Sequence, residues 1–167
     1  MTVDLLPIIN IEGKSLEVCD SIDFSQKNEI DVFFSGNAEV LAKFTVLGGS
    51  VNLSAKVSCP MEYMCDRCGT VYPSTLEFEF EETLKKESAS VNEEDNDPDV
   101  IFFTGNTVLM DEIVYKNIYM NLPVKKLCSK DCKGLCTKCG KNLNDGECDC
   151  DTRVADPRFD ALDKFFQ

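Results

Sequence analysis

The chain of 167 residues contains no histidine. This absence excludes the nucleophilic dyads and triads in which histidine activates serine or cysteine. It also restricts metal chemistry, because a zinc site in this chain must take its ligands from cysteine, with carboxylates as the remaining alternative.

Long apolar runs and a basic N-terminal segment are also absent. No stretch of about eighteen apolar residues is present, so we expect no helix that spans a membrane. The opening MTVDLLPIINIEG has no basic segment and only a short apolar run, which argues against a secretory signal. We therefore expect a cytoplasmic protein, in a compartment where thiols are kept reduced and clustered cysteines first indicate a metal site.

Positive charge is scarce, and the formal net charge is −13. A protein that wraps nucleic acid over its whole surface is therefore not expected. The charge is nevertheless uneven. Residues 77–99 carry ten acidic residues against two lysines, whereas residues 124–142 carry six lysines against Asp131 alone. The cysteine-rich segment is thus locally basic within an acidic chain.

Alternating apolar and polar residues indicate the expected strands. Residues 51–63 alternate over their whole length, which predicts a half-buried strand, and Pro60 places one end of it at an edge or a bulge. Residues 38–47 form a second strand, joined to the first by Gly48-Gly49, a pair typical of hairpins. Such neighbours predict an antiparallel meander. Further strands are predicted at 30–34, 76–81 and 100–104, with Glu77, Glu79 and Glu81 facing water.

Helical spacing is confined to two places. Apolar pairs predict a helix near 110–121, and Asp156-Pro157 predicts the start of a terminal helix. Residues 85–99 form a polar, acidic stretch that predicts a loop. We therefore expect an α+β fold. An antiparallel sheet of about five to seven strands occupies residues 1–124, and a zinc-bound C-terminal lobe occupies residues 125–167.

The ten cysteines carry most of the chemical information. Cys59 lies at an apolar position of its strand, and Cys19 follows Val18 with no other cysteine nearby, so we expect both to be buried core thiols. The other eight include two C-x-x-C-G turns, at 65–69 and 136–140, whose spacing lets one tight turn direct two sulfurs at one ion. The eight candidate metal ligands are Cys65, Cys68, Cys128, Cys132, Cys136, Cys139, Cys148 and Cys150.

Two four-thiolate zinc sites are the interpretation that we favour, since structural zinc takes four ligands. A thioredoxin-like redox motif requires a βαβ context, disulfides are disfavoured in the expected compartment, and nothing else indicates the electron transfer of an iron–sulfur cluster. In one division, Cys136, Cys139, Cys148 and Cys150 form one site, and Cys65, Cys68, Cys128 and Cys132 form the other. In the alternative, the two C-x-x-C-G turns share one ion.

Three segments together resemble a known family. They are CDRCG after a strand, LPVKKLC followed by DCKGLCTKCGKNLNDGECDC, and DPRFDAL near the C-terminus. In this order they resemble the YceD-like family of large ribosomal RNA subunit accumulation proteins. The resemblance implies a cytoplasmic bacterial protein needed for accumulation or processing of large-subunit (23S) ribosomal RNA, in a family without established catalytic residues.

We accordingly expect a non-enzymatic ribosome-biogenesis factor that acts through binding, with two zinc ions and no small-molecule substrate. The expected partner is large-subunit ribosomal RNA or a large-subunit ribosomal protein. The alternative is a zinc-dependent protein interaction module, or a chaperone for a ribosomal protein, without direct RNA contact. The lysines of residues 124–142 leave two interpretations open, because they either contact RNA or offset the negative charge of four-thiolate zinc sites.

Overall fold

The computed structural model describes residues 1–27, 32–87 and 100–150. The chain divides into two compact units. The first contains Met1–Tyr63 and Tyr72–Val124, and the second contains Met64–Val71 and Lys125–Gln167. The short segment between the two longest strands thus groups with the C-terminal part, whereas the sequence suggested a boundary only at residue 124.

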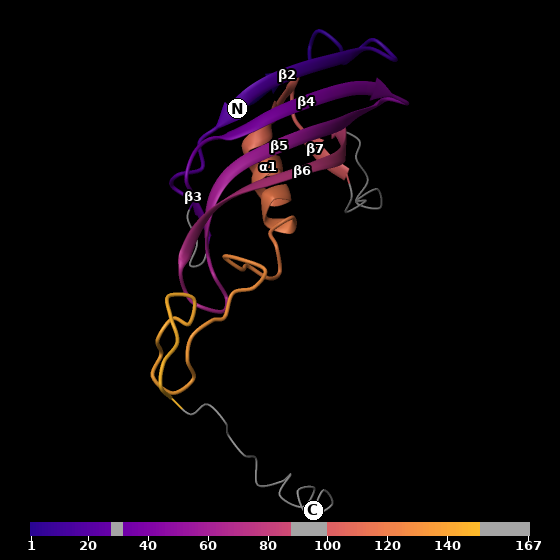
Figure 1. Cartoon of the computed structure of the whole chain (residues 1–167). Helices are drawn as coiled ribbons and strands as arrows, with labels where there is room; N and C mark the ends of the chain where they lie inside the picture. The colour runs from indigo at the N-terminus through magenta and orange to yellow at the C-terminus, as the bar shows by residue number, and fades with distance from the viewer. Residues whose placement is uncertain (28–31, 88–99, 151–167) are drawn as a thin grey trace, which may run out of the picture. The chain divides into compact units, whose positions relative to one another are not determined.

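The first unit is built on a curved, six-stranded sheet (Figure 1). Five strands lie in the order β2-β4-β5-β6-β7, and β3 pairs with β5 beside that path. These strands are β2 (Ser15–Ile22), β3 (Val32–Phe34), β4 (Ala38–Leu47), β5 (Ser50–Met64), β6 (Val71–Lys86) and β7 (Val100–Phe103).

The strands β4 and β5 form the hairpin that was predicted around Gly48-Gly49. Both glycines have positive φ values, 60° and 77°, as a tight two-residue turn between antiparallel strands requires. Along β5, every second side chain from Val51 to Tyr63 is buried. The predicted alternation over residues 51–63 is therefore confirmed.

The predicted all-antiparallel sheet is wrong at one pair, because β6 and β7 run parallel. The sheet is therefore mixed. A parallel pair needs a long connection, and the thirteen residues 87–99 between the two strands are enough to supply it. β6 also includes Lys85 and Lys86, which we had assigned to the acidic loop. Residues 88–99 of that loop lie outside the described residues.

The N-terminal part contains strands that the sequence did not reveal. β2 pairs with β4, and Cys19 lies opposite Leu41. Both side chains are exposed, so the expectation of a buried thiol at Cys19 was wrong: the register places it on the outer face of the sheet. β1 (Thr2–Asp4) and β8 (Thr107–Leu109) pair in a separate two-stranded sheet. Strands of three residues are too short to show an alternating pattern.

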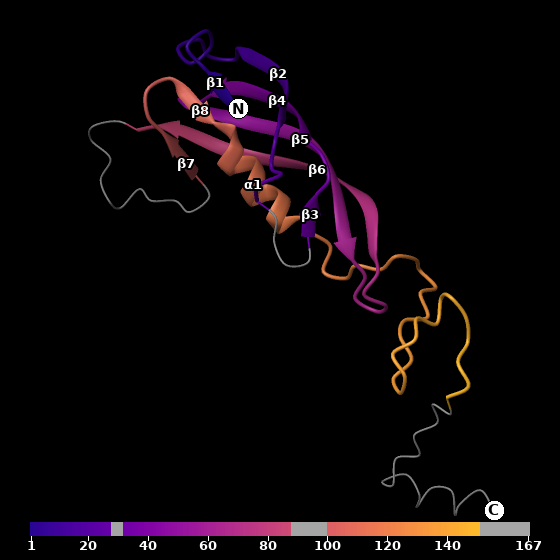
Figure 2. The ribbon, with the colours of Figure 1, turned by 90° about the vertical axis from the view of Figure 1, so that its left-hand side faces the viewer.

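The helix α1 (Met110–Met120) lies across one face of the sheet (Figure 2) and agrees with the helix predicted near 110–121. Asp111 and Glu112 lie in its first turn, where negative charge stabilises the helix dipole. Its apolar face joins the core formed by the strands. The predicted terminal helix that begins at Asp156 lies outside the described residues.

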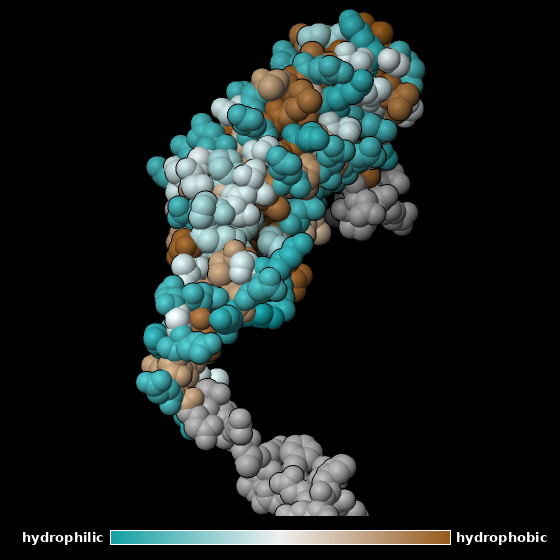
Figure 3. Space-filling model, in the orientation of Figure 1, coloured by the Kyte–Doolittle hydropathy of each residue, from teal (hydrophilic) through white to brown (hydrophobic). Residues whose placement is uncertain are grey.

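Polar side chains occupy the alternate positions of the strands, whose side chains point away from the core. Lys43 pairs with Glu17 at 3.1 Å, and Lys56 pairs with Glu79 at 3.2 Å, each between neighbouring strands. Hydrophilic and apolar residues are interspersed on the face seen in Figure 3. As predicted, the acidic side chains of β6 at residues 77, 79 and 81 are exposed. Within the described residues, no helix has the length and apolar character needed to cross a bilayer.

Replacing Leu53 by alanine should lower the free energy of unfolding of the first unit by about 2–5 kcal/mol, because the side chain is fully buried opposite Phe44. The matched control is Leu41→Ala on the neighbouring strand, whose side chain is 53% exposed. The Leu41→Ala control should lower the free energy of unfolding by well under half of that amount. Urea unfolding followed by circular dichroism measures both, and equal losses would contradict the assigned faces of the sheet.

Candidate metal centres

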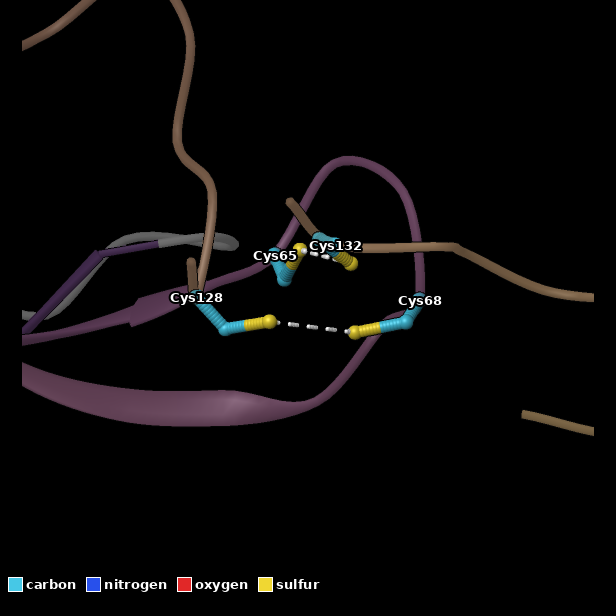
Figure 4. A group of neighbouring side chains, drawn as sticks. All are labelled: Cys65, Cys68, Cys128 and Cys132. Carbon is cyan, nitrogen blue, oxygen red and sulfur yellow. Dashed lines mark hydrogen bonds between the residues drawn. The ribbon is translucent and has the colours of Figure 1, made fainter. Parts of the chain in front are cut away.

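Four cysteines meet within the second unit and form the first cysteine group: Cys65, Cys68, Cys128 and Cys132 (Figure 4). Two come from the turn between β5 and β6, and two come from the segment after α1. All four sulfurs lie within 4.8 Å of one another. The Sγ atoms of Cys65 and Cys132 are 3.8 Å apart, and those of Cys68 and Cys128 are 3.7 Å apart.

Backbone hydrogen bonds shape the turn that presents the first two sulfurs. The N–H of Cys65 donates to the carbonyl of Thr70 at 3.0 Å, and the N–H of Gly69 donates to the carbonyl of Cys65 at 2.9 Å. Gly69 has φ +69°, in the left-handed region that side chains rarely adopt. The glycine that ends the C-x-x-C-G motif thus closes the turn, as its spacing predicted.

The later segment is held to this turn by polar contacts across sixty residues of sequence. The N–H of Asp66 donates to the carbonyl of Lys126 at 2.8 Å, and the N–H of Lys126 donates to Asp66 Oδ2 at 2.6 Å. Arg67 Nη1 donates to the carbonyl of Cys132 at 2.8 Å. These bonds bring Cys128 and Cys132 to the turn.

The second cysteine group lies in one continuous stretch of chain and consists of Cys136, Cys139, Cys148 and Cys150. Its C-x-x-C-G turn repeats the hydrogen bonds of the first. The N–H of Cys136 donates to the carbonyl of Lys141 at 2.8 Å, and the N–H of Gly140 donates to the carbonyl of Cys136 at 2.9 Å. The structure therefore gathers the eight cysteines in the first of the two divisions considered, and the two C-x-x-C-G turns do not share a group.

The sulfur separations fit a four-coordinate ion. A zinc–sulfur bond of about 2.3 Å in tetrahedral geometry places neighbouring sulfurs about 3.8 Å apart. The separations of 3.7 and 3.8 Å in the first group agree with this value. A disulfide would require about 2.05 Å, and all ten cysteines are free thiols. The donor set is thus suited to zinc, which favours thiolate ligands.

Each group contains at least one sulfur whose surroundings favour negative charge. Burial would raise the pKa of Cys65, but backbone N–H groups, first that of Cys128, outweigh it and lower this pKa to about 6. The backbone N–H groups of Cys139 and Lys138 lower the pKa of Cys136 to about 6 in the same way. Hydrogen bonds to the ionised form stabilise a thiolate, which is the form that binds metal.

Other sulfurs in the same groups resist ionisation. The contact with Cys132 raises the pKa of Cys128 to about 12, and the contact with Cys139 raises the pKa of Cys150 to about 12. Neighbouring thiolates repel one another, so a second or third charge at such short range is unfavourable without a cation. Each group is therefore suited to hold a positive ion.

Two supporting residues were not singled out from the sequence. Arg67 holds the carbonyl of Cys132, as described above. Asn144 Nδ2 lies 3.4 Å from Cys132 Sγ, and this hydrogen bond is the main reason that the pKa of Cys132 is lowered. The only sequence signal was their position inside CDRCG and inside the loop KNLNDGE, since a pattern of cysteines does not show which neighbours donate to sulfur.

The remaining two cysteines lie in the first unit, outside both groups. Cys59 is fully buried in the core, which confirms the expectation for this thiol, and burial raises its pKa to about 11. Cys19 is exposed on β2.

Fold and site together define a small α+β protein with two four-cysteine groups of the kind that holds structural metal ions. The family model described as "Large ribosomal RNA subunit accumulation protein YceD" matches residues 53–166, which is more than half of the chain. The chain therefore belongs to the YceD family, and this description connects the family with accumulation of large-subunit ribosomal RNA.

One curated relative is the large ribosomal RNA subunit accumulation protein YCED homolog 1, chloroplastic, of Arabidopsis thaliana. It is 36% identical over 45 residues, which cover 27% of this chain and 14% of the relative. The match thus spans a small part of that relative's length. No solved structure matches the chain.

Replacing Gly134 by alanine should loosen the second unit more than replacing Gly140 does. Both residues have positive φ, 76° and 72°, so each alanine costs about 1–2 kcal/mol of backbone strain. A Cβ at Gly134 would also lie 3.1 Å from the carbonyl oxygen of Arg67, whereas one at Gly140 meets nothing within 4 Å. Amide hydrogen exchange over residues 127–150 measures the loss, and equal protection in the two variants would contradict the close approach.

Proposed function

We propose that the protein is a non-enzymatic factor that supports accumulation or processing of large-subunit ribosomal RNA by binding, and that two structural zinc ions shape its contact segment. The sulfur separations in the first group carry the metal part of this proposal. The functional part is supported by membership of the YceD family.

Zinc has a clear structural task in the second unit, because residues 127–150 offer almost no apolar core. Within this stretch the buried positions are Cys132, Gly134 and Cys136, and the apolar side chain of Leu135 is 44% exposed. A segment that cannot bury apolar surface needs another source of folding free energy. Metal binding supplies it in small cysteine-rich modules.

The proposed ions would be structural, because four cysteine ligands leave no coordination position for water or substrate. The chain also has no histidine to act as a base beside such a site. A binding role is therefore favoured over a catalytic one.

The basic character of residues 124–142 indicates where RNA would bind. Lys125, Lys130, Lys133 and Lys138 are exposed, and none forms an ion pair within the described part of the chain. Ammonium groups on a segment that metal holds in place can contact phosphates with a small entropic cost. The exposed acids of β6 belong to the first unit and would repel RNA.

The purified protein should bind about two zinc ions per chain, because each four-sulfur group matches one four-coordinate ion. Removal of the metal by a chelator should abolish hydrogen-exchange protection in residues 127–150. The first unit should keep its protection, since its apolar core is independent of the cysteine groups. Elemental analysis and exchange measurements provide both readouts. One ion per chain would contradict the two-site proposal, and no ion with paired thiols would rule out metal binding.

Changing Lys125, Lys130, Lys133 and Lys138 to glutamine should weaken binding to large-subunit ribosomal RNA. Each lost phosphate contact should also reduce the slope of log affinity against log salt by about one. The matched control changes four exposed lysines of the first unit, Lys14, Lys43, Lys56 and Lys85, and alters the net charge equally. Filter binding at several salt concentrations measures the affinities, and zinc content is determined in parallel.

The results separate the interpretations of the basic segment. Retained zinc with weaker binding in the first variant alone supports an RNA contact surface. Lost zinc would instead show that the lysines offset thiolate charge. Equal weakening in both variants would indicate a nonspecific charge effect. Absence of RNA binding by the wild-type protein would favour the alternative, a zinc-dependent module that binds a ribosomal protein.

A further inference from the structure

The loop of residues 140–147 connects ligands of the second cysteine group but contacts the first. It lies between Cys139 and Cys148, both of which belong to the second group. From this loop, Asn144 Nδ2 lies 3.4 Å from the sulfur of Cys132, which belongs to the first group. The second group's loop therefore provides a hydrogen-bond donor to a proposed ligand of the other ion.

The side chain of Asn144 is fixed so that its amide nitrogen faces the sulfur. The N–H of Lys133 donates to Asn144 Oδ1 at 2.8 Å, which assigns the oxygen to that side. Asn144 Nδ2 also donates to Asn142 Oδ1 at 2.8 Å. With its oxygen engaged by the backbone, Asn144 can present only N–H to the sulfur of Cys132.

A second set of contacts ties the same loop to the first group. Asn142 Nδ2 lies 3.4 Å from Thr70 Oγ1, and this hydroxyl lies 3.3 Å from Cys68 Sγ. The N–H of Leu143 donates to the carbonyl of Gly134 at 2.9 Å, close in sequence to Cys132. Two different sulfurs of the first group thus depend, directly or through Thr70, on the position of this loop.

The position of the loop depends in turn on the second group. Its first residues are held by the bond from the N–H of Cys136 to the carbonyl of Lys141. Its far end is held by Lys141 Nζ, which donates to the carbonyl of Glu147 at 2.7 Å. Leu143 is the one apolar side chain of the loop and is partly exposed, so apolar burial does not hold the loop in place. The ligands at its two ends, when joined through one ion, would fix its shape.

We propose that the two metal sites are coupled, with Asn144 as the positioning residue that links them. This inference rests on the proposed metal binding. An ion at the second group orders the loop of residues 140–147, and the ordered loop donates a hydrogen bond to Cys132. That bond holds the sulfur of Cys132 in position as a ligand and raises the affinity of the first group for metal. Coupling of binding free energies is reciprocal, so metal at the first group raises affinity at the second.

The hydrogen bond from Asn144 to Cys132 sets how strongly metal at one group should change the metal affinity of the other. Outer hydrogen-bond partners of metal ligands typically change metal affinity by about 10–100-fold. The bond comes from a single neutral donor, the amide of Asn144, so we expect an effect of about tenfold, at the lower end of this range.

The experiment measures cobalt(II) affinity at the first group by competition with a chelator, using the thiolate-to-cobalt absorption band. One variant, Cys139→Ser with Cys148→Ser, disables the second group. Another, Asn144→Ala, keeps all eight cysteines. The matched control is Asp145→Ala in the same loop, whose side chain forms no hydrogen bond or ion pair within the described residues.

Both the disabled second group and Asn144→Ala should weaken the first site by about tenfold, and Asp145→Ala should leave it unchanged. Combining all three substitutions should cost no more than disabling the second group alone, because both act through the same bond. The coupling would be overturned if the affinity losses of the two variants multiplied in the combined variant, or if neither variant changed the cobalt affinity of the first group. Either result would leave the proposal of two metal sites intact. A wild-type protein that binds no cobalt or zinc would overturn the proposed function and the coupling together.

Discussion

The repulsion among four closely placed sulfurs is the constraint on which the second unit depends. In each group the atoms lie within 4.8 Å of one another. Backbone N–H groups favour the thiolate of Cys65, while the neighbouring sulfur keeps Cys128 protonated. Only a cation allows all four to ionise together. Because a segment with few buried residues surrounds these sulfurs, the proposed coordination would take the place of apolar burial as the source of order.

The first unit is stabilised in the ordinary way, by the burial of apolar side chains. Alternating side chains on β4 and β5 fill a core that α1 covers. β5 ends at Met64 and β6 begins at Val71. These two residues flank the turn that contains Cys65 and Cys68. Half of the first group lies in this turn, and the other half lies in the segment that follows the helix.

The two units also differ in charge, which is consistent with a binding role in the YceD family. The second unit has exposed lysines around the cysteine groups, whereas β6 in the first unit exposes acids. Metal would hold the lysine-bearing segment in one shape, so that less conformational entropy is lost when it contacts a partner. The same charges would discourage nonspecific binding of RNA to the sheet.

The sequence by itself determined the features that consecutive residues encode. The period of two over residues 51–63, the glycine hairpin and the C-x-x-C-G turns each depend on a few neighbouring residues, so they could be predicted. The grouping of the eight cysteines was one of two divisions that the spacing allowed, and the fold selected one. The tertiary structure alone decided the parallel pairing of β7, the exposure of Cys19, and the contact of Asn144 with Cys132. Each depends on the register or path of segments that are not adjacent in sequence, and residue patterns within a segment carry no information about its neighbours in space.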